Sequence, residues 1–196
     1  METWSEYYTD EIGIDGYIRN LYGQKDFLVA ITADKPAKIL EVGAGTGTMS
    51  IFLSQLDTEV TTLDNDPVVL VAAEHNKQRF NGRNTLVAGD AFKLPFPDHS
   101  FDVVFHQGLL EHFSDQDIRQ LLNEHLRVAP VVWLSVPNQF YPRRDKGDER
   151  LLDSATWEGI LSPYRIEISK NYSRKFFPKW YLPRVHVQYM AKISSR

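Results

Sequence analysis

The chain has 196 residues, of which 42% are hydrophobic, so it is long enough to fill the core of one domain. It has no cysteine, which excludes disulfides, thiolate metal sites and cysteine nucleophiles. The net charge of −4 argues against general affinity for nucleic acid, because such binding needs many cationic contacts to phosphates. No basic segment precedes an apolar run, and the longest apolar stretch, near VAPVVWLSVP, is too short to span a bilayer. We therefore expect a soluble, cytoplasmic protein without a membrane span.

The first half of the chain alternates between helical and strand patterns. After an aromatic N-terminal segment, a helix is predicted from about Ile14 to Thr32, and the buried strand AKILEVG follows. A second helix is predicted from about Gly47 to Leu56, and EVTTLD has the pattern of a second strand. DPVVLVAAEHNKQRF predicts a helix with Asp66 as its N-cap and Pro67 in its first turn, where the missing N–H costs nothing.

The second half continues this alternation and then changes character. NTLVAGD and FDVVFHQ predict the third and fourth strands, and VVWLSVPN predicts a fifth strand that ends at Pro137. Ser114 is the expected N-cap of a helix over DQDIRQLLNEHL, whose apolar residues lie on one face: Ile118, Leu121, Leu122 and Leu126. YRIEISKNY and VHVQYMAKI are extended runs without a helical pattern, so we expect them to pair as an antiparallel edge.

Strands that alternate with helices predict an α/β fold with a parallel sheet covered on both faces. In open parallel sheets, ligands bind outside the carboxyl ends of the strands. We therefore expect a single crevice, built by the loops that follow Val42, Leu63, Gly89, Phe105 and Val136.

The loop in ILEVGAGTGTMS carries three glycines at alternate positions, Gly43, Gly45 and Gly47. Glycine has no Cβ, so these positions permit backbone conformations and a close ligand approach that a side chain would block. The stretch predicts a strand, a ligand loop and a helix start. A nicotinamide enzyme is the main enzymatic alternative, but the third glycine comes one residue early for G-x-G-x-x-G and the second half of a dinucleotide domain is missing.

Acidic residues mark the ends of the strands around this loop. Glu41 precedes the first glycine, and Asp64 closes the second strand, where a carboxylate can accept hydrogen bonds from both hydroxyls of a ribose. Asp90, in AGDAF, can accept a hydrogen bond from the amine of adenine. Each Asp taken alone is equally explained as a turn former. Their joint placement after the glycine loop indicates an adenosine-containing ligand.

Together these residues resemble the class I S-adenosylmethionine-dependent methyltransferases, whose first motif is an acidic residue followed by G-x-G-x-G. The resemblance covers nearly the whole chain, including LPFPDHSFDVVF and the closing antiparallel pair. It implies a Rossmann-like, doubly wound, mostly parallel seven-stranded sheet with an antiparallel C-terminal strand pair. It also implies a single methyltransferase domain over residues 1–196. Residues 1–35 would form an N-terminal lid or helix segment, 36–137 the cofactor-binding core, and 138–196 the acceptor-side loops and C-terminal strands.

The resemblance further implies S-adenosylmethionine as cofactor and S-adenosylhomocysteine as product. The residues it assigns to the cofactor are Gly43, Ala44 and Gly45 at the methionine part, Asp64 and Asn65 at the ribose, Asp90 and Ala91 at the adenine, and His106 or Gln107 near the methionine or methyl group. Glu41 is expected to support this loop from behind.

The sulfonium methyl group of this cofactor is already electrophilic, so alignment of the acceptor and exclusion of water are the main tasks of such an enzyme. If the acceptor is a hydroxyl or a protonated amine, His106 or His112 is the candidate base, with a structural role as the alternative. Glu111 and His112 resemble part of the Glu-x-x-Glu-His metal motif of quinone O-methyltransferases and small-RNA methyltransferases. Gly108 replaces the earlier Glu, so no metal site is predicted.

The acceptor is expected beside three further segments of the chain. The candidate acceptor-side residues are Trp4, Tyr7, Tyr8, Tyr141, Arg143 and Arg144. The N-terminal aromatics fit either a lid or a packing contact on the core. From Lys170 to Arg196 the chain has seven Lys or Arg and no Asp or Glu, which fits either a solvated face or a basic rim for an anionic substrate. The mixture of aromatic and basic residues favours an aromatic or anionic acceptor.

A small-molecule acceptor is expected, because the chain has no added domain to recognise a macromolecule. DNA methylation finds no support, since FHQG replaces the Asn/Asp-Pro-Pro-Tyr type of motif at the end of the fourth strand. Methylation of RNA or protein stays an alternative. So does a non-catalytic subunit that binds S-adenosylmethionine and regulates a partner.

Overall fold

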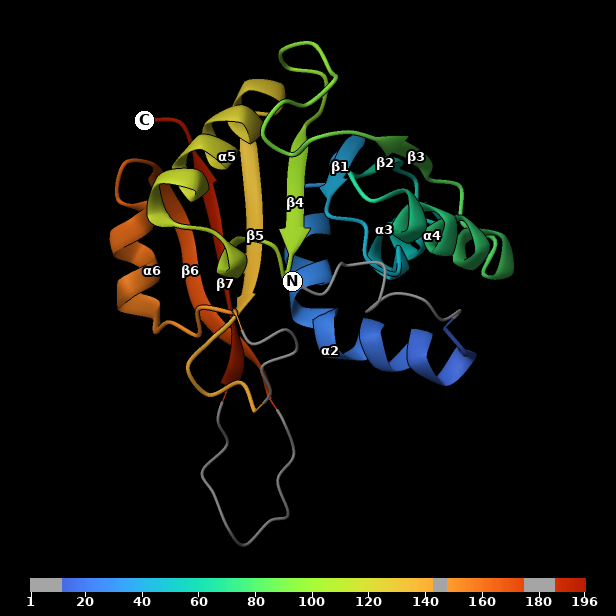
Figure 1. Cartoon of the computed structure of the whole chain (residues 1–196), viewed down its shortest axis with the longest axis horizontal. Coiled ribbons are helices and arrows are strands. Elements are labelled where there is room, and N and C mark those ends of the chain that lie inside the picture. Colours follow the sequence, from blue (N-terminus) through green and yellow to red (C-terminus); the bar gives the residue numbers. More distant parts are fainter. Residues whose placement is uncertain (1–11, 143–147, 175–185) are drawn as a thin grey trace, which may run out of the picture.

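The computed structural model describes residues 12–142, 148–174 and 186–196, and these residues form one seven-stranded sheet in the order β3-β2-β1-β4-β5-β7-β6 (Figure 1). The strands are β1 (Lys38–Val42), β2 (Glu59–Asp64), β3 (Thr85–Ala88), β4 (Val103–Gln107), β5 (Val131–Pro137), β6 (Arg165–Arg174) and β7 (His186–Ser194). Adjacent strands in this order are parallel from β3 through β5, and β7 is antiparallel to both β5 and β6. The predicted fold class and the antiparallel C-terminal pair are confirmed.

The helices are α2 (Ile14–Thr32), α3 (Thr48–Leu53), α4 (Pro67–Arg79), α5 (Asp115–Val128) and α6 (Ser154–Leu161), with a 3₁₀ turn, η1, at Leu110–His112. Two predicted N-caps are confirmed, since Asp66 accepts from the Val68 N–H at 2.8 Å and Ser114 from the Asp117 N–H at 3.2 Å. The second helix ends at Leu53 rather than Leu56. No helix in the described residues has the length and apolar character needed to cross a bilayer.

Helix α6 was not predicted from the sequence. It has eight residues, too few to show a clear helical period, although its N-cap signal is present: Asp153 accepts a hydrogen bond from the Thr156 N–H at 2.7 Å. Trp157, Ile160 and Leu161 bury its inner face. Packing of these side chains, more than local propensity, stabilises so short a helix.

Helices cover both faces of the sheet, with α5 and α6 on one face and α2, α3 and α4 on the other (Figure 1). Side chains along a strand point alternately to the two faces. In β1, Leu40 and Val42 therefore join the core under α5 and α6, whereas Ile39 joins the core under α2 and α3. The face to which a polar side chain at the carboxyl end of a strand points thus depends on its place in this alternation.

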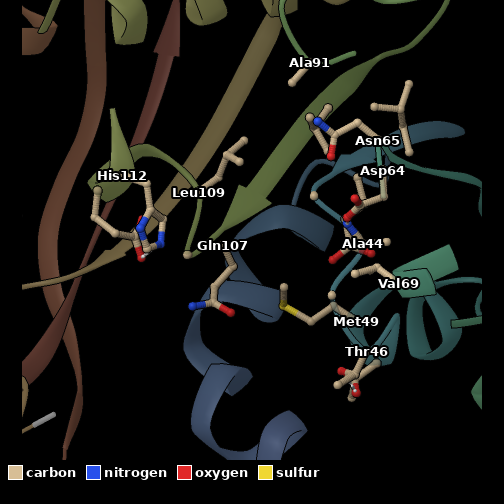
Figure 2. Close-up of a pocket in the computed structure, with 18 of the residues that line it drawn as sticks. Ala44, Thr46, Met49, Asp64, Asn65, Val69, Ala91, Gln107, Leu109 and His112 are labelled. Carbon is tan, nitrogen blue, oxygen red and sulfur yellow. Dashed lines mark hydrogen bonds and ion pairs between the residues drawn. The ribbon is translucent and has the colours of Figure 1, made fainter. Parts of the chain in front are cut away.

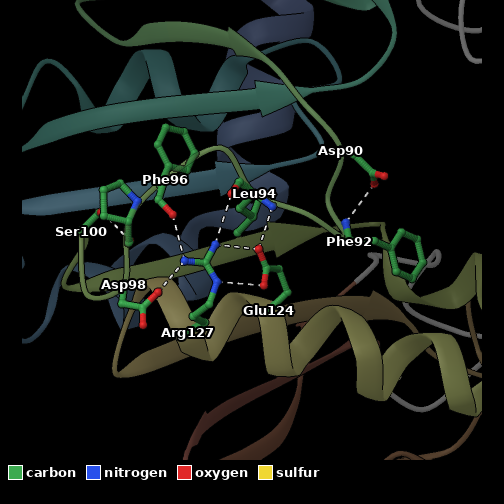
Figure 3. A network of polar contacts seen from close by, with 9 residues as sticks. Asp90, Phe92, Leu94, Phe96, Asp98, Ser100, Glu124 and Arg127 are labelled. Carbon is green, nitrogen blue, oxygen red and sulfur yellow. Dashed lines mark hydrogen bonds and ion pairs between the residues drawn. The ribbon is translucent and has the colours of Figure 1, made fainter.

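The segment between β3 and β4 is held against α5 by the guanidinium group of Arg127 (Figure 3). Arg127 donates to the carbonyl oxygens of Phe96 at 2.9 Å and Leu94 at 3.1 Å. It also pairs with Asp98 and Glu124, each at 2.7 Å, and Glu124 accepts from the Leu94 N–H at 2.8 Å. Backbone groups of a loop that has no sheet partner are thereby satisfied, which fixes the loop beside β3.

Two histidines meet between the sheet and α5. His106 of β4 and His125 of α5 are both fully buried, with ring centroids 5.4 Å apart. Neither ring nitrogen of His106 has a hydrogen-bond partner among the described residues. Burial, together with the neighbouring imidazole of His125, lowers the pKa of His106 well below its ordinary value. Burial lowers the pKa of His125 to about 4, although the carboxylate of Glu124 opposes that shift.

This pair predicts loss of stability in acid. The pKa of His125 falls from 6.5 to about 4 on folding, so the unfolded chain binds the proton more readily. The stabilisation is complete above pH 6.5 and is lost as the pH decreases toward 4, by on the order of 3 kcal/mol at about 1.4 kcal/mol per pKa unit. His125→Leu should flatten the decline in a plot of unfolding free energy against pH. His75→Leu, at an exposed position on α4, serves as control, and an unchanged decline in His125→Leu would contradict the assignment.

Candidate functional site

A cavity of about 700 Å³ lies at the carboxyl ends of β1, β2, β4 and β5. Its lining includes a residue from each strand-end loop named by the sequence: Gly43, Asp64, Asp90, Gln107 and Pro137. Figure 2 shows Gln107 in the middle, with Asp64, Asn65 and Ala44 to one side and His112 to the other. The cavity therefore has a glycine-loop side and an η1 side, with the end of β4 between them.

The glycine loop has the left-handed backbone that its composition predicts. The φ angles of Gly43, Gly45 and Gly47 are +81°, +48° and +71°, values that L side chains rarely adopt. Gly43 also donates its N–H to the carbonyl oxygen of Leu63 at 2.9 Å, which ties the loop to β2. A Cβ at Gly43 would project to 3.6 Å from the Leu109 side chain across the cavity. The loop thus presents bare backbone to whatever occupies the cavity.

Asp64 joins the end of β2 to the glycine loop. Its Oδ2 accepts a hydrogen bond from the Ala44 N–H at 2.8 Å, and its Oδ1 accepts one from the Asp66 N–H at 3.0 Å. Burial raises the pKa of Asp64, and these backbone hydrogen bonds act against that shift. Each carboxylate oxygen has a second lone pair, so the side chain can still accept hydrogen bonds from a diol in the cavity.

Glu41 lies beneath the loop and is 3% exposed. The hydroxyl of Ser50 donates to its Oε2. Burial, and to a lesser extent the nearby charge of Asp64, raises the pKa of Glu41 to about 8. Glu41 is therefore protonated at neutral pH and acts as a neutral hydrogen-bonding group.

A protonated Glu41 makes Glu41→Gln a near-isosteric change. Because the pKa rises from 4.5 to about 8 on folding, the native state holds the proton more tightly, and this stabilisation is lost as the pH rises from 4.5 to 8. In Glu41→Gln that decline should disappear, while the unfolding free energy above pH 8 should equal or exceed that of the parent chain. Thermal unfolding at a series of pH values measures this, with the exposed Glu59→Gln as control. Parallel curves for Glu41→Gln and the parent would show that Glu41 is ionised throughout.

Asp90 and Ala91 lie on the rim of the cavity at the end of β3. Asp90 is exposed, and its Oδ1 accepts a hydrogen bond from the Phe92 N–H at 2.9 Å. This hydrogen bond forms a turn, as expected if Asp90 had a structural role only. The same carboxylate borders the cavity with Ala91, Asp64 and Asn65, so all four residues that the resemblance assigns to a nucleoside line the cavity.

His106 does not line the cavity. It is fully buried and packs toward His125 on the α5 side of the sheet, whereas the next residue, Gln107, is among the lining residues. The reason is the alternation of side chains along β4, which sends neighbouring residues to opposite faces. Of the two alternatives offered by the sequence, Gln107 is the one at the cavity. His106 is therefore neither a candidate base nor a candidate cofactor contact.

His112 lines the cavity on the η1 side, and its Nδ1 lies 2.9 Å from Asp148 Oδ1. Its Nε2 is 4.0 Å from Glu111 Oε1. His112, Asp148 and Glu149 each offer a ligand atom, all within 4.8 Å of one another, and they are the group of described residues whose geometry can hold a cation. The same contact between His112 and the Asp148 carboxylate is equally suited to orienting His112 as a base.

Of the acceptor-side candidates, Tyr141 lines the cavity. Trp4, Tyr7, Tyr8, Arg143 and Arg144 lie outside the described residues. The sequence reasoning missed several polar lining residues: Asn20 and Gln24 of α2, Thr46 of the glycine loop and Gln188 of β7. One available signal was Gln188 itself, a polar side chain inside the apolar run VHVQYMAKI.

Known proteins agree with this geometry. Residues 39–130 match the family described as "Methyltransferase domain". The demethylmenaquinone methyltransferase of Anoxybacillus flavithermus is 34% identical over 133 residues, covering 66% of this chain and 55% of that protein. The PH0226 protein from Pyrococcus horikoshii superposes with a TM-score of 0.75 at 17% identity, over 96% of this chain and 95% of that one. Magnesium protoporphyrin IX methyltransferase from Synechocystis PCC 6803, solved with bound S-adenosylmethionine, gives a TM-score of 0.68 at 18% identity, over 98% of this chain and 89% of that one.

The chain spans between 29% and 64% of the length of the curated relatives it matches. The solved structures share its fold along nearly the whole chain. The domain match, the methyltransferase relatives and the fold all agree with the glycine loop and the strand-end acids. The family match over residues 39–130, the methyltransferase relatives and the shared fold together support the class I S-adenosylmethionine-dependent methyltransferase superfamily.

Proposed function

We propose that this protein transfers a methyl group from S-adenosylmethionine to a small-molecule acceptor. The observation that carries this proposal is the cavity, in which Ala44 of the glycine loop and Asp64 lie on one side and His112 on the other (Figure 2), with Asp90 also in the lining. Matched relatives include a demethylmenaquinone methyltransferase, whose name points to a small acceptor, which supports the small-molecule class.

The residues of the glycine-loop side fit the parts of this cofactor. The left-handed glycine backbone leaves room for an amino-acid moiety, because no Cβ projects into the cavity there. Asp64 retains lone pairs for the ribose hydroxyls, and Asn65 lies beside it. The carboxylate of Asp90 and the backbone of Ala91, which line the cavity after β3, would meet the adenine edge.

When bound, S-adenosylmethionine supplies an electrophilic sulfonium methyl group, so the chain itself mainly positions the acceptor and excludes water. Gln107 lies between the two sides of the cavity, where the methyl group and the acceptor would meet (Figure 2). His112, oriented by Asp148, would accept the proton of a hydroxyl or ammonium acceptor at Nε2. This base role and a cation-binding role for His112, Asp148 and Glu149 exclude each other, because both use the same ring nitrogens.

Replacing Asp64 tests the cofactor site. Asp64→Ala removes the acceptor for the ribose hydroxyls, and two charge-assisted hydrogen bonds at about 1.5–3 kcal/mol each correspond to a loss of at least about a hundredfold in affinity. Calorimetric titration with S-adenosylhomocysteine measures this, and circular dichroism checks that the fold is kept. Asp57→Ala, at an exposed position, is the matched control. Unchanged affinity in Asp64→Ala would remove Asp64 from the site.

Replacing His112 tests the base. His112→Gln should slow methyl transfer to a hydroxyl or ammonium acceptor by about 10²–10⁴-fold, the usual contribution of a positioned base. Affinity for S-adenosylhomocysteine should stay unchanged. The rate is followed as release of S-adenosylhomocysteine with an acceptor found by screening, and His75→Gln is the control. Activity that is lost on chelation and restored by a divalent cation would instead assign His112 to a metal site.

A further inference from the structure

Four side-chain amides line one part of the cavity. They are Asn20 and Gln24 from α2, Gln107 from the end of β4, and Gln188 from β7. Gln188 is 5% exposed, and its Oε1 has no hydrogen-bond partner among the described residues. Gln24 is 8% exposed, and its Oε1 accepts a hydrogen bond from the Tyr172 hydroxyl at 2.5 Å. A buried amide whose carbonyl oxygen lacks a hydrogen-bond partner is rare in a folded protein and calls for an explanation.

The strand register places these amides on the same side of the sheet. Gln188 lies opposite Tyr172 in β6, and directly opposed residues of an antiparallel pair point to the same face. Because the Tyr172 hydroxyl reaches Gln24, that face is the one covered by α2. Gln107 follows Phe105 by two residues, and Phe105 packs on Phe27 of the same helix.

Within this group, Gln188 lies away from the glycine loop. Gln188 belongs to β7, which is three strands from β1 in the sheet order, and strands are spaced about 4.8 Å apart, so the two strands are roughly 14 Å from each other. The methionine part of the cofactor is assigned to the end of β1. Gln188 is therefore on the acceptor's side of Gln107, not the cofactor's.

Resting on the proposed function, we propose that Gln188 binds the methyl acceptor, and that the acceptor is an uncharged molecule which donates an N–H or O–H hydrogen bond to Gln188 Oε1. An amide carries no net charge, so it cannot neutralise a buried carboxylate or ammonium group. The carboxylates of the lining already have interaction partners within the protein, through the hydrogen bonds given above for Glu41, Asp64 and Asp90 and through further interactions of Glu111 and Glu149. A neutral N–H or O–H group can donate a hydrogen bond to Gln188 Oε1 without the cost of burying a charge. The anionic acceptor that the basic C-terminal segment left open is accordingly disfavoured, and of the two acceptor types considered for His112 the hydroxyl is favoured over the ammonium group.

Stability separates this role from a structural one. A buried carbonyl oxygen without a hydrogen-bond partner destabilises the empty protein, so replacing the amide by an apolar side chain of similar volume removes that cost. Gln188→Leu should therefore keep or raise the melting temperature of the ligand-free protein. A residue that supports the fold through its own hydrogen bonds would lower it. Gln120→Leu, at an exposed position on α5, is the matched control.

The test uses three probes of one size: benzamide, benzoate and benzylamine, which are neutral, anionic and cationic. Each is titrated at millimolar concentration into protein saturated with S-adenosylhomocysteine, and saturation-transfer NMR reports binding. Benzamide should bind about tenfold more tightly than either charged probe, and Gln188→Leu should reduce its affinity about tenfold, as expected for one lost buried hydrogen bond. Gln120→Leu should not change it, and neither variant should change the affinity for S-adenosylhomocysteine.

The outcomes separate this inference from the function on which it rests. If S-adenosylhomocysteine binds but benzoate or benzylamine equals benzamide, the neutral acceptor class is wrong. If benzamide fails to bind, or binds Gln188→Leu as tightly as the parent, Gln188 is not an acceptor contact. Failure of S-adenosylhomocysteine to bind the parent protein overturns the methyltransferase proposal itself.

Discussion

The hydrogen bond from the Ala44 N–H to Asp64 Oδ2, at 2.8 Å, joins the two strand ends on which the site depends. It holds the glycine loop that follows β1 against the end of β2. It also fixes the orientation of the Asp64 carboxylate at the edge of the cavity. The protonated Glu41 beneath the loop avoids a second negative charge next to Asp64, since burial raises its pKa to about 8. Glu41 is thus neutral in this corner, whereas the carboxylate of Asp64 accepts two backbone hydrogen bonds, because their surroundings differ.

The remaining walls of the cavity depend on how the neighbouring loops are fixed. Arg127 of α5 satisfies the backbone of the segment after Asp90 through the carbonyl oxygens of Leu94 and Phe96 (Figure 3). Without these contacts the loop would carry unpaired polar groups next to the apolar core. On the opposite side, the hydroxyl of Tyr172 links Gln24 to Ser135, so α2 and the C-terminal strands are joined by buried hydrogen bonds. The part of the cavity that we propose for the acceptor lies at that junction.

The fold was largely predictable, because strands β1 to β5 alternate with helices except between β3 and β4, and helix caps such as Asp66 and Ser114 are visible in the sequence. The glycine loop and the strand-end acids were predictable for the same reason: local spacing puts them at one edge of the sheet. His106 shows where such reasoning is limited, since a choice between adjacent strand residues needs the register of the whole sheet. Gln24 and Gln188 are 164 residues apart in the chain (188 − 24), and only the tertiary pairing of α2, β6 and β7 brings them to one cavity.

The most direct measurement is calorimetric titration of the protein with S-adenosylmethionine and S-adenosylhomocysteine, with a nicotinamide dinucleotide as the control ligand. Binding of the two sulfur ligands at micromolar concentration, without binding of the dinucleotide, is the expected result, because the third glycine of the loop and the acids at β2 and β3 match the former. Binding of the dinucleotide alone would contradict the assignment of the cavity to S-adenosylmethionine.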